Sequence, residues 1–253
     1  MSISGRHING IAIVVALPFL ALLMFTSFLQ PAPQKHDRTA LEAALRYLDT
    51  LPADARSVLF PDNQPQVQAI TEGEAGRDAL DTLRALRPDR YRPARFGRGG
   101  LQIVVLPGFL EKGVTERKEL LTKHAISPDF AAMLSPLPAS HPPCSAFLGE
   151  ANGWAWGGFV FVDPQAGAMS LEEARACVIA GFDYLLGVPV AGGRFDWKLF
   201  PDPAASLVLL DHVRQCAHAG KTDHVPPLRN NRGITSLPSL SCIRAGITAA
   251  LTD

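Results

Sequence analysis

The chain has 253 residues, of which 47% are hydrophobic and 19% charged, and this balance excludes an intrinsically disordered protein. The 24 lysine and arginine residues equal the 24 aspartate and glutamate residues, so the formal net charge of zero argues against a nucleic-acid-binding protein. The 21 prolines favour a body that is rich in loops.

The N-terminal segment predicts a membrane anchor. Residues 8–29, INGIAIVVALPFLALLMFTSFL, carry no charge, and a helix of this length spans about 33 Å, close to the hydrocarbon core of a bilayer. A cleaved signal peptide is the alternative, but the segment is long and lacks an Ala-x-Ala exit. We expect residues 1–7 to be a short tail and the body to lie on the periplasmic side of the inner membrane. The flanking charges differ little, so the opposite orientation stays open.

Residues 30–98 are expected to form a linker that contains short helices. Residues 37–52 place apolar side chains at helical spacing, and residues 74–86 predict a second helix. A basic stretch follows, in which Arg87, Arg90, Arg92 and Arg95 are candidates for contact with anionic lipid or an acidic partner. Charge runs of this kind more often face water, which is the competing interpretation.

Residues 99–253 are expected to form the main domain. Residues 101–109, LQIVVLPGF, predict a buried strand that Pro107-Gly108 ends. Residues 144–163 predict two strands around a Gly-rich turn. Trp154 and Trp156 would point to the same side of the second strand, either as a ligand or partner surface or as part of the core.

Three helices are predicted in the second half of the chain. In the first, SLEEARACVIAGFDYLLGVP, Ser170 and Glu173 form a capping box, and Gly187 suits the position after the last turn. The second covers residues 203–219, and the third lies near the C-terminus. Because the strands come early and the helices late, we predict an α+β fold with a small antiparallel or mixed sheet, preceded by one transmembrane helix.

The four cysteines, Cys144, Cys177, Cys216 and Cys242, all lie in the main domain. One or two disulfides would form in an oxidising compartment, with three possible pairings between which the sequence does not decide. The competing interpretation is four small buried hydrophobic residues.

The sequence contains no H-E-x-x-H, G-x-S-x-G, P-loop or G-x-G-x-x-G motif. The nearest approach to a metal site is DHVRQCAHAGKTDH, with His212, Cys216, His218 and His224 as weak candidate ligands. A helix aligns only His212 and Cys216, whereas zinc needs three or four ligands. We therefore predict no metal and no cofactor. Cys144 with the nearby His141 is a further weak candidate for nucleophilic catalysis.

Residues 144–253 resemble a family of uncharacterised bacterial envelope proteins, a domain of unknown function common in alphaproteobacteria and thought to be related to zincin-type metallopeptidases. The resemblance rests on Cys177, Leu186-Gly187, the loop KLFPD and the pair Ile243-Arg244. The family's Glu-Glu pair is replaced by Ala180-Gly181, which neither transfer protons nor bind a metal. The resemblance therefore implies a zincin-like body whose helix has lost its chemistry.

These observations predict a single-pass membrane protein of the cell envelope that acts as a structural or interaction module without catalytic residues. Its partners would be the bilayer, through residues 8–29, and an envelope protein. Two alternatives stay open: a metal-dependent hydrolase acting on envelope peptides or polymers, and a lipid- or peptidoglycan-binding module.

Overall fold

The structure, a computed structural model, describes residues 36–53, 55, 57–58, 65–94, 100–126, 128–151, 154–191, 195–219 and 238–252. The chain divides into two units, Met1–His36 and Asp37–Asp253, and the fold below is that of the second. The strands are β1 (Gln66–Thr71), β2 (Arg92–Pro93), β3 (Leu101–Val105), β4 (Cys144–Ala151) and β5 (Trp154–Val162). The helices are α2 (Arg38–Thr50), α3 (Gly73–Leu86), α4 (Val114–Lys123), α5 (Pro128–Leu134), α6 (Leu171–Leu186), the 3-10 helix η2 (Trp197–Leu199), α7 (Pro203–Ala219) and α8 (Leu240–Thr252).

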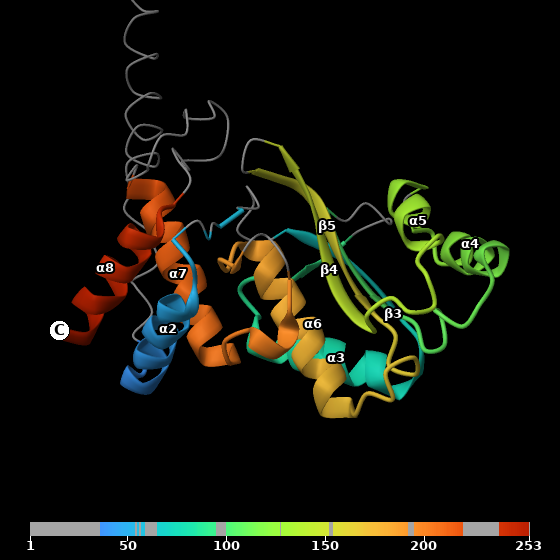
Figure 1. Ribbon diagram of the computed structural model, residues 1–253, viewed down its shortest axis with the longest axis horizontal. Helices are drawn as coiled ribbons and strands as arrows, with labels where there is room; N and C mark the ends of the chain where they lie inside the picture. Colours follow the sequence, from blue (N-terminus) through green and yellow to red (C-terminus); the bar gives the residue numbers. More distant parts are fainter. Residues whose placement is uncertain are drawn as a thin grey trace, which may run out of the picture. The chain divides into compact units, whose positions relative to one another are not determined.

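The strands form one mixed sheet in the order β2-β1-β3-β5-β4. The pairs β1–β2, β1–β3 and β3–β5 are parallel, and only β4 runs antiparallel, in the predicted hairpin with β5. The α+β fold with a mixed sheet and several helices is therefore confirmed. The hairpin is the predicted pair of strands around the Gly-rich turn, and Figure 1 shows its two long strands side by side.

The compact unit begins at Asp37, so the domain boundary expected at residue 99 is not where the fold begins. The reason is β1, which the sequence analysis placed in a linker although it pairs with β3 along its length. Its sequence, QVQAIT, has two glutamines and lacks the continuous apolar character of β3. Strand β1 takes its place in the sheet through contacts that are distant in sequence.

Helices cover both faces of the sheet. Ile103 and Val105 of β3 point to the face covered by α3 and α6, while Val104 and Leu106 point to the face covered by α4 and α5. Figure 1 shows α6 and α4 on opposite sides of the strands. Since both faces are buried, β3 reads as an uninterrupted apolar run apart from Gln102. The amide of Gln102 donates to the side chain of Gln68 on β1.

A group of three helices, α2, α7 and α8, packs beside α6. Leu48 of α2, Val213 of α7 and Ile243 of α8 are all at most 1% exposed and belong to the same core as α6. The helix predicted at residues 37–52 is therefore an integral part of the domain and not a linker element. Its apolar face fills the space between α7 and α8.

Helix α6 has the predicted ends. The Ser170 hydroxyl accepts a hydrogen bond from the backbone N–H of Glu173, and the Glu173 carboxylate accepts one from the backbone N–H of Ser170. Gly187, with a φ of 119°, ends the helix in the left-handed region that favours glycine. The predicted anchor, residues 8–29, lies outside the described residues, and among the helices of the described residues none has the length and apolarity to cross a bilayer.

Candidate functional site

The segment Ala180-Gly181 is a packing contact and does not line a groove. Ala180 is 6% exposed, and a Cβ added to Gly181 would lie 2.7 Å from Cγ1 of Val160 on β5. Helix α6 can approach the sheet this closely because residue 181 has no side chain. A glutamate there would have to displace the strand. Helix–sheet packing therefore accounts for the small residue at 181, and the interpretation of the pair as a former active site stays a prediction.

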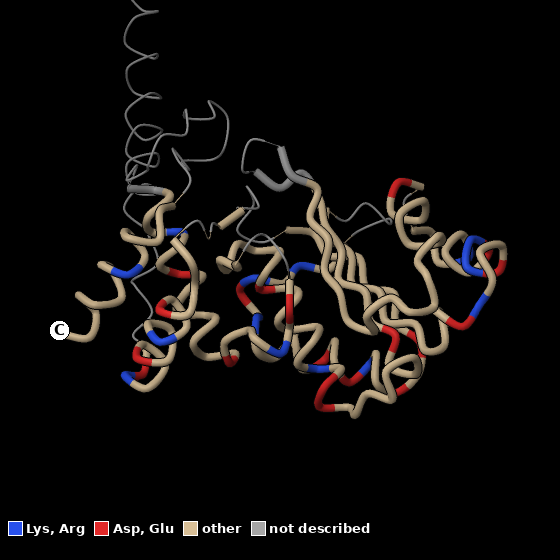
Figure 2. The backbone as a smooth tube through the Cα atoms, in the orientation of Figure 1, with Lys and Arg blue, Asp and Glu red and all other residues tan. Residues whose placement is uncertain are grey.

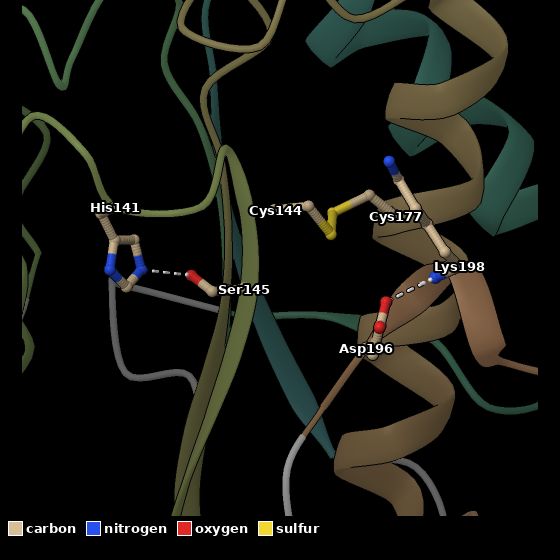
Figure 3. Close-up of a disulfide and its surroundings, with 6 residues drawn as sticks. All are labelled: His141, Cys144, Ser145, Cys177, Asp196 and Lys198. Atoms are coloured by element: carbon tan, nitrogen blue, oxygen red, sulfur yellow. Dashed lines mark hydrogen bonds between the residues drawn. A yellow bond between two sulfur atoms is a disulfide. The ribbon is translucent and has the colours of Figure 1, made fainter.

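All four cysteines form disulfides. Cys144, the first residue of β4, is bonded to Cys177 in the middle of α6, and Cys216 of α7 is bonded to Cys242 of α8. Figure 3 shows the first bond joining the sheet to the helix. Each disulfide therefore links elements that also pack together, one between sheet and helix and the other within the helical group.

The candidate metal ligands do not form a site within the described residues. Cys216 is bonded to Cys242 and offers no thiolate, and His212 is buried on α7, where Gly246 of α8 packs against its ring. The side chain of His218 and the whole of His224 lie outside the described residues. Among the described residues no group of three or more His, Cys, Asp or Glu side chains has the arrangement of a metal site.

The arginine stretch is not a continuous basic surface. Arg87 is 2% exposed and forms two hydrogen bonds, of 2.9 and 2.6 Å, with the carboxylate of Asp183 on α6. Burial lowers the pKa of Arg87, but the hydrogen bond to Asp183 and its negative charge more than offset this and raise the pKa, so the guanidinium stays charged. Arg87 therefore belongs to the interior, which corrects its assignment to a partner surface.

The other members of the predicted surface are dispersed. Arg90 forms an ion pair with Asp211 of α7, Arg92 is exposed on β2, and Arg95 lies outside the described residues. Trp154 and Trp156 lie at the start of β5. Strand β3 pairs with β5 only from residue 158 onward, so it does not flank this part of β5. Their side chains lie outside the described residues, so the two-residue surface stays a prediction.

The carboxyl ends of β1 and β3 form the most distinctive polar region. After β1 the chain enters α3 on one face of the sheet, and after β3 it enters α4 on the other face. Parallel sheets bind ligands at such switch points. Here Nε2 of His124 lies 2.9 Å from the carboxylate of Glu72. Strands β1, β3 and β5 carry no charged residue, and Figure 2 shows charged residues in the helices and loops around the sheet. We call Glu72, Glu111, Lys112, Glu116 and His124 the switch-point surface.

The loop after β3 is held from both sides. The buried carboxylate of Asp163, directly after β5, accepts hydrogen bonds from the backbone N–H groups of Gly108 and Leu110 at 2.8 and 2.7 Å. The buried guanidinium of Arg117 donates to the carbonyl oxygens of Phe109 and Leu110. Asp163 thus satisfies donors of the loop and Arg117 satisfies acceptors, which fixes the loop's conformation without regular secondary structure.

Unusual backbone angles gather at the same end of the sheet. Gly73 and Gly108, after β1 and β3, have φ values of 74° and 68°. Two alanines also have positive φ: Ala125, next to His124, at 53°, and Ala168, in the loop after β5, at 46°. A non-glycine residue in this region costs about 1–2 kcal/mol, and such strain gathers at functional sites. Strand β1 was not predicted from the sequence, and its pairing with β3 is what makes these loops neighbours.

One pair of side chains has the elements of nucleophilic catalysis. Nε2 of His141 lies 3.1 Å from the hydroxyl of Ser145 on β4, and the ring stacks on Phe147 (Figure 3 shows the pair). Burial lowers the pKa of His141, so the imidazole is neutral near pH 7 and able to accept a proton. Acyl transfer also requires oxyanion donors and a group that orients the base, and neither is defined around this pair by the contacts described.

Comparisons with protein-family models, with curated proteins and with solved structures gave no match to this chain. The family resemblance of residues 144–253 stays a prediction.

Proposed function

We propose that the chain is a membrane-anchored interaction protein of the bacterial cell envelope, with its body outside the cytoplasm and with no catalytic role. The observation that carries the proposal is the pairing of all four cysteines into two disulfides. Stable disulfides form in oxidising compartments and are rare in the cytosol. An uncharged run of 22 residues, 8–29, followed by such a domain fits a single-pass envelope protein.

The switch-point surface is the region that we assign to the partner. Its side chains carry both signs of charge, and the loop that presents Glu111 and Lys112 is fixed by Asp163 and Arg117. A rigid loop loses little conformational entropy when a partner binds, and mixed charges select a partner of complementary pattern. These properties favour recognition of a folded, polar protein surface.

Site-specific photo-crosslinking in living cells tests this assignment. A photoreactive amino acid would replace Glu111 in one strain and Asp81, an exposed residue of α3, in the matched control strain. The proposal predicts a discrete crosslinked species at position 111 and none at position 81. Equal crosslinking at both positions, or none at position 111 in cells that contain the anchored protein, contradicts it.

Anchoring and orientation are tested separately. The full chain should remain in the membrane fraction after alkaline carbonate extraction, and protease added to spheroplasts should digest its body. A chain that lacks residues 8–29 provides the control. Release by carbonate, or protection from protease until the membrane is broken, would refute the anchored, outward-facing arrangement.

A second candidate, a serine hydrolase, is favoured by the contact between His141 and Ser145. A fluorophosphonate probe distinguishes the two candidates because it labels activated serines. We expect no labelling of the wild-type chain. Labelling that disappears in Ser145→Ala and persists in Ser140→Ala would establish the hydrolase instead.

A further inference from the structure

An aromatic segment, Phe195–Phe200, lies on the outside of the domain between α6 and α7 in sequence. It contains the 3-10 helix η2, and Leu199 at its end is 75% exposed, more than any other large hydrophobic residue among those described. An isolated exposed leucine needs no explanation. Here, however, it lies in a segment whose Phe195 and Phe200 belong to a continuous group of rings.

The rings extend from α6 to α2. Tyr184 of α6 contacts Phe195 at 5.4 Å between ring centroids, Phe195 contacts Phe200 at 5.9 Å, and Phe200 contacts Tyr47 of α2 at 6.2 Å. The Tyr47 hydroxyl donates to the carbonyl of Pro189, which fixes this end of the group. The contacts between these rings hold the segment in place. The side chain of Leu199, in contrast, stays 75% exposed.

The two residues before Leu199 give the segment an interfacial composition. The ammonium of Lys198 lies 5.6 Å from the centroid of the half-buried Trp197 ring, and the backbone N–H of Lys198 donates to Asp196, which caps η2. Figure 3 shows Asp196 and Lys198 beside α6. Tryptophan and lysine beside an exposed leucine are the residue types that occupy the headgroup region of a bilayer.

We propose that Trp197, Lys198 and Leu199 form a second contact with the bilayer, in which Leu199 enters the acyl region and Lys198 remains among the lipid phosphates. This inference rests on the proposed anchoring by residues 8–29. Only residues 30–37 separate that segment from α2, and eight extended residues reach at most about 28 Å. Tyr47 lies nine residues into α2, a rise of about 14 Å, so the bilayer is within reach of the aromatic segment.

Fluorescence quenching by brominated lipids tests the contact. The full chain with Trp154→Phe and Trp156→Phe keeps Trp197 as its only tryptophan, and it would be reconstituted into phosphatidylethanolamine–phosphatidylglycerol vesicles with or without brominated acyl chains. The control chain has all three tryptophans replaced by phenylalanine together with Met133→Trp, at an exposed position of α5 on the opposite face of the sheet.

The inference predicts loss of Trp197 emission in brominated vesicles, no loss for residue 133, and recovery of emission when Leu199→Glu is added to the reporter chain. Unquenched Trp197 in a chain that still floats with vesicles overturns the contact and leaves the anchor intact. Equal quenching at both positions also overturns it. A chain that fails to float with vesicles refutes the anchor itself.

Discussion

Removal of the Cys144–Cys177 disulfide should cost a large share of the stability of the domain. The bond closes a loop with a sequence separation of 33 residues. In the chain-entropy model this restriction of the unfolded state contributes about 3.7 kcal/mol at 25 °C. Alanine is the appropriate replacement at both positions because Cys144 and Cys177 are buried, and serine would leave a hydroxyl to be satisfied there.

Urea unfolding of the full chain in detergent micelles, followed by near-UV circular dichroism, measures the effect. With a slope of about 2 kcal/mol/M, the midpoint of the Cys144→Ala/Cys177→Ala variant should fall by about 2 M. The Cys216→Ala/Cys242→Ala variant is the matched control: its separation of 26 residues predicts a similar loss, about 3.5 kcal/mol. Unchanged midpoints in both variants would show that the bonds are absent from the isolated protein and refute the reasoning.

Three further predictions concern single positions. Arg87→Leu should destabilise the domain by about 3–5 kcal/mol, because it leaves the carboxylate of Asp183 buried without its partner, and the double variant Arg87→Leu/Asp183→Leu should recover part of that loss in the same urea assay. Glu173→Gln should lower the melting temperature only at higher pH: the capping hydrogen bonds lower the Glu173 pKa, so its contribution is present above the ordinary glutamate pKa of about 4.3 and is lost as the pH falls through the folded pKa. Ala125→Gly should stabilise the domain by up to about 1 kcal/mol, since glycine tolerates the φ of 53° that ends α4, whereas a melting temperature lower than that of the wild type would contradict the strain.

The helices that were predicted correctly have their signals within the local sequence. The capping box at Ser170, the terminating Gly187 and the apolar face of residues 37–52 all act over a few residues. Strand β3 was predicted for the same reason, as a short apolar run that Pro107-Gly108 ends. Local physics was sufficient for these elements.

The features that the sequence did not predict depend on residues far apart in the chain. Strand β1 has a mixed composition, and only its pairing with β3 makes it a strand. Arg87 reads as one cation of a basic run, yet its partner, Asp183, is 96 residues away. The small size of Gly181 matches the nearness of Val160 on β5. Each of these contacts follows from the fold as a whole, which the sequence pattern left open.

The oxidation state of the cysteines in the cell tests the central claim most directly. Cells that express the full chain would be quenched with acid, denatured, and treated with a maleimide–polyethylene glycol reagent that adds mass to each free thiol. The account predicts no addition without reductant and four additions after reduction. Four additions without reductant would mean that the domain resides in a reducing compartment, and the envelope function would be contradicted.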